Sequence, residues 1–312
     1  MQQLVAGRFG IPEAVLQLCG MDRPAPPAGQ VVVRMLASAI NPSDRLTIGG
    51  AYPHRTPLPF VPGYEGVGCV EMVGREVANL RVGQRVLPLG SAGGWQTYRT
   101  LPAEWCVSVP DSLSDDDAAL SYVNPLTALL MIERLGLSPG QRVGINAAAS
   151  TIGRMLIRFV HARGACPIAI VRSQRSAAAL DGEPILTIVV GGQVIPPVDH
   201  GLDAVGGDEG ARLAAVVRSG GVFVYYGLLS GRALPPELAR NSVAIVEPFW
   251  LRNWVHQAPK SRLHRRMQDA FASMQSGLAR ATKVTRFCLR DFRKALAFDA
   301  AEGRQGKVLL MP

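Results

Sequence analysis

The stretch from Gln141 to Gly227 alternates short apolar runs with amphipathic segments, and this alternation constrains the fold more than any other feature. It begins with the run RVGIN, the helical stretch TIGRMLIRFVHARG, the run PIAIVR and the helical stretch SQRSAAAL. Two further runs, GLDAVGG and GGVFVYYG, flank the helical stretch EGARLAAVVRSG. Strands that alternate with helices pack as a parallel sheet covered on both faces, so the pattern predicts an α/β fold with a doubly wound sheet.

The rest of the chain has a different texture. The part before about Pro110 is rich in Val, Gly and Pro, which predicts a Gly-rich β domain. Helices are expected at 118–135 and 261–276, and the final run KVLLMP predicts a strand that returns to the first domain. Because 312 residues, 48% of them hydrophobic, suffice for two packed cores, we expect one domain of 1–120 with 283–312 and a second of 121–282.

Bulk composition limits the environment and the partners. The five cysteines are scattered singly, which favours a reducing cytoplasm over a disulfide framework or a CxxC metal site. The start MQQLVAGRFG lacks the features of a secretory leader, and no long apolar run predicts a membrane span. The net charge of +9 and pI of 9.7 would attract a polyanion, whether nucleic acid, anionic lipid or a phosphorylated cofactor or substrate.

A turn of small residues joins the run RVGIN to the helical stretch that follows. It reads Asn146-Ala-Ala-Ala-Ser150-Thr-Ile-Gly153. Its small side chains would let backbone amides at the helix start approach a pyrophosphate. Ser150 is equally a good N-cap, so simple helix capping is the alternative.

The next strand ends at Arg172, about 20 residues after the turn, where NAD-binding folds usually place an acidic residue against the ribose. Arg172 and Arg175 could instead bind the ribose 2′-phosphate of NADP through charge-assisted hydrogen bonds. Solvated surface arginines are the alternative for both.

The segments NPSDRLTIGGAYP, residues 41–53, and PGYEGVG, residues 62–68, resemble the mitochondrial-type 2-enoyl thioester reductases. These belong to the zinc-free quinone reductase branch of the medium-chain dehydrogenase/reductase superfamily. Further segments follow in family order: Gly94-Trp95, Asn124 to Ala128, the Ser150 turn, Ala204 to Gly207, Tyr226-Gly227, Phe249 to Leu251, Trp254 and Lys307. The resemblance implies a GroES-like catalytic domain beside a Rossmann domain, an enzyme that uses NADPH, and a homodimer.

The same resemblance assigns roles to individual residues. It makes Tyr52 the counterpart of the family's catalytic tyrosine, and it places Asn41 and Trp95 in the substrate pocket. The positions that it matches to NADPH contacts are Asn124, Ser150, Thr151, Ile152, Gly153, Arg172, Tyr226, Gly227, Leu228, Leu229, Phe249, Trp250, Leu251 and Lys307; Arg175 joins them from the argument above.

Each of these roles has a structural alternative. Tyr52 could be an aromatic in a turn after Gly49-Gly50, and Asn41 could serve turn formation, as could Asp44, which is left out of the site. Trp95, Phe249, Trp250 and Trp254 could be aromatic core residues.

The sequence also departs from the family. Gln174 stands where a second phosphate-recognising arginine is usual, and Leu228 and Leu229 replace glycines. The segment 181–200 is shorter and richer in Pro and Gly, which leaves that edge of the sheet open. A catalytic zinc needs three Cys, His or carboxylate ligands; the two expected regions read NPSD and GYE, and the four-cysteine lobe is missing, so no metal is predicted.

The predicted reaction is NADPH-dependent reduction of a 2-enoyl thioester carried by coenzyme A or a carrier protein. Hydride goes to the β-carbon and a proton to the α-carbon, with Tyr52 as proton donor or enolate-orienting group. The alternatives are a quinone or another activated alkene as acceptor, and a non-enzymatic RNA-binding relative, although no RNA-binding aromatic signature is present. The basic stretch 260–266 would either meet substrate phosphates or form a solvated helix face.

Overall fold

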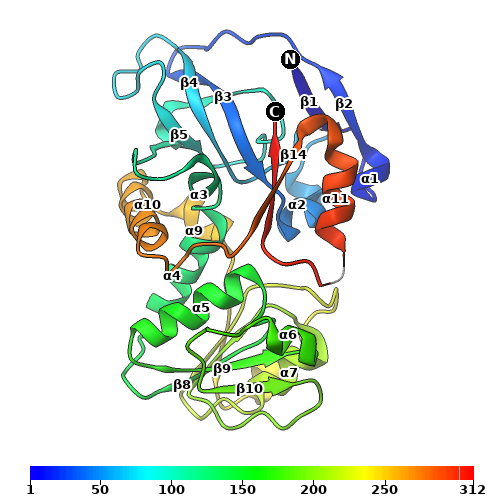
Figure 1. Cartoon of the computed structure of the whole chain (residues 1–312), viewed down its shortest axis with the longest axis vertical. Helices are drawn as coiled ribbons and strands as arrows, with labels where there is room; N and C mark the ends of the chain where they lie inside the picture. The colour runs from blue at the N-terminus through cyan, green and yellow to red at the C-terminus, as the bar shows by residue number, and fades with distance from the viewer. Residues whose placement is uncertain (302) are drawn as a thin grey trace. The chain divides into compact units, whose positions relative to one another are not determined.

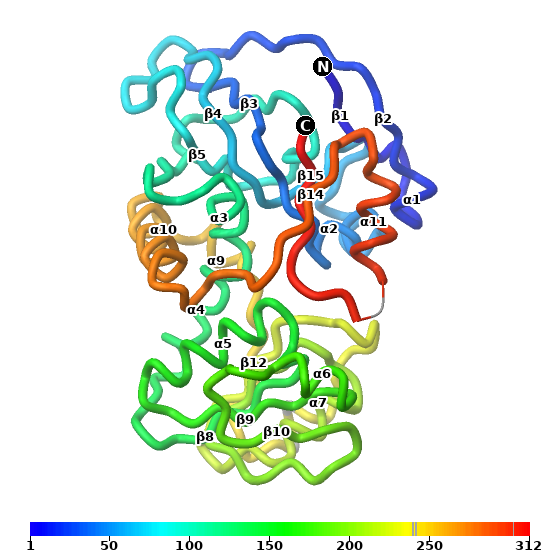
Figure 2. Tube along the Cα trace, in the orientation of Figure 1, coloured from blue at the N-terminus to red at the C-terminus, as the bar shows by residue number. Residues whose placement is uncertain are grey.

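The computed structural model describes residues 1–301 and 303–312, without the side chains of Ala239 and Asn241. Its contacts divide the chain into two compact units. Unit 1 combines Met1–Val123 with Trp254–Pro312, and unit 2 comprises Asn124–Asn253. Figure 2 traces the chain out of unit 1 through cyan and green and back through orange and red.

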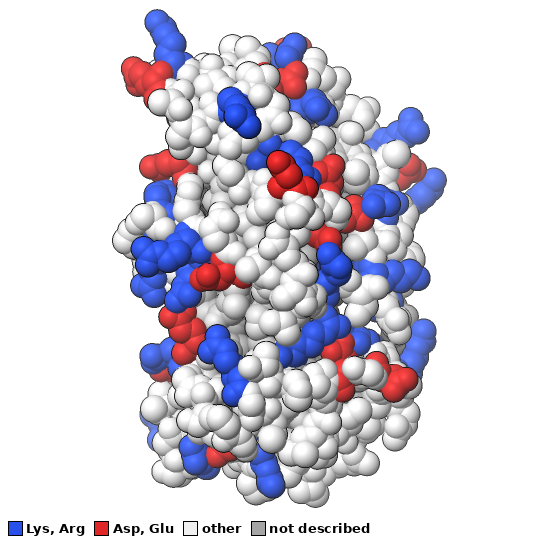
Figure 3. All heavy atoms as spheres, turned by 60° about the vertical axis from the view of Figure 1, so that its left-hand side comes forward, with Lys and Arg blue, Asp and Glu red and all other residues white. Residues whose placement is uncertain are grey.

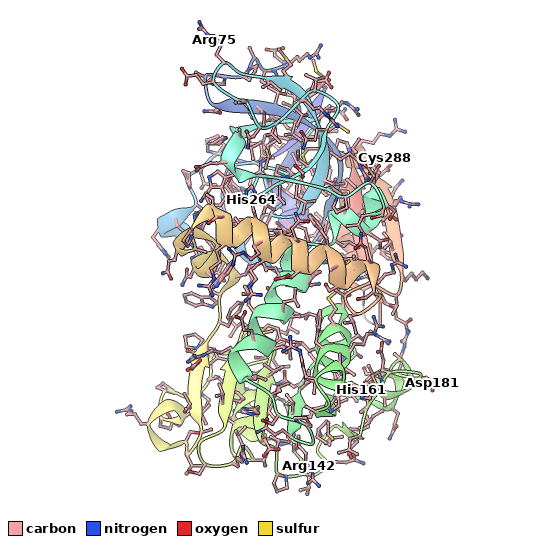
Figure 4. All side chains as sticks on the ribbon, turned by 90° about the vertical axis from the view of Figure 1, so that its left-hand side faces the viewer. Arg75, Arg142, His161, Asp181, His264 and Cys288 are labelled. Carbon is pink, nitrogen blue, oxygen red and sulfur yellow. The ribbon has the colours of Figure 1, made fainter. Side chains whose placement is uncertain are left out.

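The second boundary differs from the one expected. Residues 254–282 were assigned to the cofactor domain, whereas their contacts place them in unit 1. The reason is the apolar face of helix α10, Lys260–Gln275, which buries Leu263, Met267 and Phe271. His264 of this helix also lies 3.2 Å from the carbonyl oxygen of Glu104, within unit 1 (Figure 4).

Unit 1 is built on a seven-stranded sheet in the order β14-β15-β3-β4-β5-β7, with β6 paired to β3, and a separate β1-β2 hairpin (Figure 1). Its strands are β1 Gln2–Ala6, β2 Leu16–Gly20, β3 Gln30–Ala39, β4 Gly66–Val73, β5 Arg85–Pro88, β6 Tyr98–Pro102, β7 Cys106–Ser108, β14 Val284–Cys288 and β15 Lys307–Met311. Its helices are α1 Pro12–Val15, α2 Pro42–Ile48, α3 Asp115–Ala119, α10 and α11 Phe292–Ala300, with 3-10 turns at Pro53–Arg55, Ala103–Trp105 and Leu289–Asp291.

The returning strand predicted at the carboxyl terminus is confirmed. β15 pairs antiparallel with β3 and parallel with β14, so the last residues complete the sheet that the first hundred residues begin. The core beneath it joins residues distant in sequence, including Leu4, Ile48, Trp95, Phe292 and Leu310. This core fixes the position of α2 and of the loop that follows it.

Unit 2 contains the doubly wound sheet, with six strands in the order β10-β9-β8-β11-β12-β13, all parallel to their neighbours. The strands are β8 Arg142–Ile145, β9 Cys166–Val171, β10 Thr187–Val190, β11 His200–Asp203, β12 Val222–Tyr225 and β13 Ile245–Pro248. The helices are α5 Thr151–Ala162, α6 Gln174–Ala178, α7 Gly207–Ala214 and α8 Leu238–Asn241; α4 Val123–Leu135 leads into the unit and α9 Leu251–Gln257 leads out of it. Right-handed crossovers in opposite directions put α5 and α7 on opposite faces.

The sheet is wider than the expected apolar runs indicated. β10 forms within the shortened segment 181–200, and β13 lies at the other edge. The helix expected over 118–135 is two helices, because α3 ends at Ala119 and α4 starts at Val123. Ser114 begins α3 by accepting a hydrogen bond from the Asp117 amide at 3.1 Å, and the acidic residues Asp115, Asp116 and Asp117 form the first turn of this helix.

Candidate active site

The topological switch point of the parallel sheet lies between β8 and β11. The chain moves from β8 toward β9 on one side and from β11 toward β12 on the other, so the connections diverge at the carboxyl ends of these strands. Ligands of doubly wound folds bind in the crevice that such divergence opens. Asn146 directly follows β8, and Asp203 is the last residue of β11.

Asn146 and Asp203 form a buried network across the switch point. The Asn146 Nδ2 donates to Asp203 Oδ1 at 2.5 Å, and the Ala204 amide donates to Asn146 Oδ1 at 2.8 Å. The Asp203 carboxylate also accepts from the amides of Val205 at 2.9 Å and Gly206 at 3.1 Å. This network fixes the two loops that follow β8 and β11. Sequence reasoning missed Asp203, although an acidic residue inside an apolar strand signals a buried, fully bonded carboxylate.

The turn after β8 has the tight geometry that its small residues predicted. Ala147 has φ of +46°, and Ser150 caps α5 by accepting the Gly153 amide at 3.1 Å. A Cβ at Gly153 would lie 2.5 Å from the Ala148 carbonyl oxygen, so only glycine fits. Thr151 and Ile152 form the first turn of this 12-residue helix, where the helix dipole favours an anion. Capping by Ser150 is therefore confirmed, while the anion site remains a prediction.

Two exposed arginines follow the neighbouring strand. Arg172 comes directly after β9, and Arg175 lies on α6, which Ser173 caps by accepting the Ser176 amide at 3.3 Å. Both residues follow the carboxyl end of β9, which pairs in parallel with β8, the strand that precedes the Ser150 turn. The arrangement agrees with a phosphate-binding role and does not test it.

Residues after β12 and β13 present apolar surface at the same edge of the sheet, because all six strands are parallel. Leu228 is 41% exposed, Leu229 is 55% exposed and Trp250 is 54% exposed. Phe249 and Leu251 beside Trp250 are half-buried. Exposed apolar side chains near a few polar groups are typical of ligand sites, and for Trp250 the exposure argues against the core alternative.

Tyr226 and Gly227 complete this edge. The Tyr226 amide donates to the Asp203 carbonyl oxygen at 2.8 Å, whereas its buried hydroxyl has no hydrogen-bond partner within the described residues. Burial, followed by the charge of Asp203, raises the pKa of this phenol. A Cβ at Gly227 would lie 2.5 Å from the Ala204 carbonyl oxygen, so the backbone approach requires glycine. Asn124 is half-buried in the first turn of α4.

In unit 1, Asn41 and Lys307 lie in a buried polar cluster and contact each other. The Lys307 Nζ donates to Asn41 Oδ1, and to the Ile40 carbonyl oxygen at 3.3 Å. The Asn41 Nδ2 donates to Glu65 Oε2 at 3.0 Å. Lys307 is 6% exposed and Asn41 is 1% exposed, so structural pairing accounts for both, and their predicted ligand contacts remain untested.

Glu65 and Asp44 are the carboxylates of this cluster. Glu65 Oε1 accepts the amides of Tyr122 at 3.1 Å and Val123 at 2.7 Å, which satisfies donors at the start of α4. Asp44 accepts the amides of Asn41 at 2.8 Å and Tyr64 at 3.1 Å. Both carboxylates are thus bonded to protein amides, although the sequence had left them outside the site.

Burial shifts the acid–base behaviour of the cluster. Burial raises the pKa of Asp44 to about 7, although its two backbone hydrogen bonds and Lys307 act in the opposite direction. Burial also lowers the pKa of Lys307, against the attraction of Glu65, Asp299 and Asp44. No group of three or more His, Cys, Asp or Glu residues capable of holding a metal occurs in the described ranges 1–301 and 303–312.

Tyr52, the predicted proton donor, lies on the loop between α2 and β4, before the 3-10 turn Pro53–Arg55. Its ring is half-buried, and its hydroxyl forms no hydrogen bond with the residues that the structure describes. Trp95 is fully buried and donates from Nε1 to the Ala39 carbonyl oxygen at 3.1 Å. Core packing therefore accounts for Trp95, and its predicted substrate contact gains no support from the fold.

Comparisons with known proteins agree with this architecture. Residues 27–111 match the model of the alcohol dehydrogenase GroES-like domain. The mitochondrial enoyl-[acyl-carrier-protein] reductase of Arabidopsis thaliana is 31% identical over 304 residues, which cover 90% of this chain and 79% of the relative. The Caenorhabditis elegans enzyme of the same name is 30% identical over 315 residues, covering 95% of this chain and 90% of the relative. A solved Bacillus thuringiensis structure, assigned as an NADPH:quinone reductase, has a TM-score of 0.94 and 32% identity, covering 100% of this chain and 98% of its own.

Proposed function

The chain belongs to the enoyl and quinone reductases of the medium-chain dehydrogenase/reductase superfamily, and from this premise we propose that it reduces the activated C=C bond of a 2-enoyl thioester with NADPH. As a member of this family it is an oxidoreductase. The observation that carries the thioester is the likeness to enoyl-[acyl-carrier-protein] reductases along nine-tenths of the chain, with 31% identity over 304 residues. The Tyr52 hydroxyl forms no hydrogen bond with the described residues, which supports a role in proton donation.

The residues at the switch point fit NADPH. A Cβ at Gly153 or at Gly227 would lie 2.5 Å from a backbone carbonyl oxygen, so these glycines permit the close backbone approach of the turns at this edge. The first turn of α5 offers a dipole that favours pyrophosphate. Arg172 and Arg175 are suited to a ribose 2′-phosphate, since guanidinium groups bind phosphate through paired hydrogen bonds. The unpartnered Tyr226 hydroxyl is a further polar group at this edge that a bound ligand could satisfy.

Bound NADPH would supply a hydride to the β-carbon of the substrate. The π electrons of the C=C bond then move toward the carbonyl, and negative charge develops on the thioester oxygen. Tyr52 has one of two roles in the proton transfer. Its hydroxyl transfers its proton to the α-carbon, after which water returns a proton to the phenolate, or it donates a hydrogen bond to the thioester oxygen while water protonates the α-carbon. One hydride and one proton are thus added across the double bond.

The test is oxidation of NADPH, with NADH in parallel, by purified protein given crotonyl-CoA, a longer 2-enoyl-CoA and a simple quinone. Thioester-dependent oxidation that falls at least tenfold in Tyr52→Phe would support the proposal and the role of Tyr52. Thioester turnover unchanged in Tyr52→Phe would refute that role. The absence of thioester turnover, with quinone turnover intact, would refute the substrate.

A quinone or another activated alkene is the second candidate acceptor. The specific observation in its favour is the 32% identity and TM-score of 0.94 to the Bacillus thuringiensis structure assigned as an NADPH:quinone reductase. An RNA-binding function has no such support. On the face drawn in Figure 3, basic and acidic side chains are interspersed, without the continuous basic surface that nucleic acid requires.

We further propose a homodimer and a reducing compartment such as the cytoplasm. The edge strand β13 and its approach expose Val243 at 66% and Ile245 at 51%, which suits pairing with a second copy, and sedimentation equilibrium would test this. All five cysteines are free thiols, which agrees with a reducing compartment. Among the helices formed by the described residues, none is long and apolar enough to span a membrane.

A further inference from the structure

We propose that Arg55 is a positioning residue for Tyr52; this inference rests on the proposed function, which makes Tyr52 the proton donor. The guanidinium carbon of Arg55 lies 3.9 Å from the centroid of the Tyr52 ring. At this separation the planar guanidinium stacks on the ring face, where the negative quadrupole of the ring attracts a cation. The contact pairs a permanent positive charge with the side chain that handles the proton.

The local sequence makes this contact. Tyr52 precedes the 3-10 turn Pro53–Arg55, and the Arg55 amide donates to the Tyr52 carbonyl oxygen at 3.3 Å. A 3-10 helix has three residues per turn, so the side chains at i and i+3 eclipse each other. Pro53 at the first position presets the backbone for this turn. The four residues Tyr-Pro-His-Arg therefore bring the guanidinium over the ring without help from distant parts of the chain.

The surrounding loop is held at both ends. At one end, the Ala51 amide donates to the Leu46 carbonyl oxygen of α2 at 3.0 Å. At the other, Phe60 and Ala6 exchange backbone hydrogen bonds of 2.9 and 3.1 Å. Between these anchors, the Tyr52 side chain has no hydrogen bond to the described residues, and the Arg55 guanidinium over its ring restricts the rotation of the ring.

The positive charge of Arg55 is also not neutralised by a carboxylate among the described residues. Within the described part of the chain, Arg55 forms no ion pair with a carboxylate. Arg23, which stands over the Tyr98 ring, differs because it is paired with Glu71 at 2.5 Å. A half-buried guanidinium that has no ion-pair partner among the described residues stabilises the negative charge that develops on the Tyr52 oxygen as its proton is donated. Arg55 forms and breaks no bond in this role.

The experiment combines Arg55→Gln, Arg55→Lys, Tyr52→Phe and the double variant Tyr52→Phe/Arg55→Gln. His54→Gln, an exposed neighbour in the same turn, is the matched control. Turnover of crotonyl-CoA is compared with that of crotonyl N-acetylcysteamine, which has the thioester without the phosphates. We expect Arg55→Gln to lower kcat about tenfold on both substrates with KM within about twofold, as a partly desolvated cation–π contact permits. Arg55→Lys should recover part of the loss, and Arg55→Gln should have no further effect on top of Tyr52→Phe.

Three results would overturn the inference. The first is an Arg55→Gln variant that behaves like His54→Gln. The second is an additive effect of Arg55→Gln and Tyr52→Phe, measured in the double-mutant cycle. The third is a rise of KM confined to the coenzyme A substrate, since this would make Arg55 a phosphate-binding residue.

A readout without turnover separates this inference from the proposed function. Protein labelled with carbon-13 at the tyrosine ζ position reports the Tyr52 ring by NMR, with Tyr52→Phe assigning its signal. Arg55→Gln should shift that signal, and His54→Gln should leave it in place. An unchanged signal in Arg55→Gln would refute the contact even if the wild-type protein turned over no thioester, whereas a shifted signal in a protein inactive on thioesters would refute the substrate alone.

Discussion

Glu65→Gln should lower the free energy of unfolding by more than the loss of one negative charge would, because both oxygens of the Glu65 carboxylate accept hydrogen bonds and an amide NH₂ cannot. Glu65 Oε1 accepts two amides at the start of α4, and Oε2 accepts the Asn41 Nδ2 at 3.0 Å. In Glu65→Gln the amide NH₂ that replaces Oε2 would face the Nδ2 NH₂ of Asn41, and both groups are hydrogen-bond donors. Asn41 cannot rotate to present its oxygen instead, because that oxygen accepts the Lys307 Nζ.

The expected magnitude follows from these contacts. Losing one buried hydrogen bond to a charged group costs about 1.5–3 kcal/mol. The two backbone amides keep an acceptor but lose its charge, and charge-assisted hydrogen bonds are roughly twice as strong as neutral ones. We therefore expect Glu65→Gln to reduce the free energy of unfolding by about 3 kcal/mol. Asn41→Asp would offer an acceptor both to the introduced side-chain amide and to Lys307, so the double variant Asn41→Asp/Glu65→Gln should recover most of the loss.

The assay is urea unfolding followed by circular dichroism. Glu71→Gln is the control, because Glu71 makes surface ion pairs with Arg23, whose side chain is 52% exposed, and such pairs contribute less than about 1 kcal/mol. The reasoning is refuted if Glu65→Gln unfolds like Glu71→Gln. It is equally refuted if the double variant is no more stable than Glu65→Gln alone.

Three further predictions concern pH and the cofactor. The pKa of Asp44 is about 7 in the folded protein against its usual 3.8, so folding favours the protonated form and the free energy of unfolding should fall by roughly 3 kcal/mol from pH 4 to 7. Asp44→Asn should flatten this slope in pH-dependent urea unfolding, and a slope equal to wild type would contradict the prediction. Gly153→Ala should weaken NADPH binding about tenfold or more in titration calorimetry, because the added Cβ meets the Ala148 carbonyl oxygen. Gly192→Ala, where the Cβ would meet open space, is the control and should bind NADPH normally. Equal affinities of the two variants would exclude the turn at Gly153 as part of the NADPH site. Arg172→Glu should raise the KM for NADPH about tenfold or more and leave that for NADH unchanged, and an equal rise for both cofactors would rule out 2′-phosphate recognition.

The elements of unit 2 could be predicted because their signals are local. Apolar runs at the expected places became β8, β9, β11 and β12, and the Ser150 turn became a capped helix start. β10 and β13 were missed because edge strands are short and half-exposed, so their apolar runs are weak. The domain boundary near 282 was missed because α10 looks the same in sequence whichever unit buries its apolar face.

The site divides in the same way. Tyr52 and the NADPH-contacting positions were predicted because the segments that contain them resemble the family and occur in the same order. In the structure, Ser150 caps a helix, and Gly153 and Gly227 lie where a Cβ would collide with backbone. The sequence named neither Asp203 nor Glu65, because the partners that satisfy these buried carboxylates lie far away in the chain. It also did not pair Arg55 with Tyr52, although three residues separate them, because the contact exists only in a 3-10 turn and not in an extended loop.

The sequence by itself determined the alternation of strands and helices, the small-residue turn and the helix caps, since each depends on side chains within a few residues of one another. Tertiary structure decided which polar groups are buried and what they bond. Asn41 reaches Glu65 across 24 positions and Lys307 across 266, and Trp95 lies in the core beneath a strand from the carboxyl terminus. Such contacts depend on the order in which strands assemble into a sheet, because the sheet and not the chain makes distant residues neighbours.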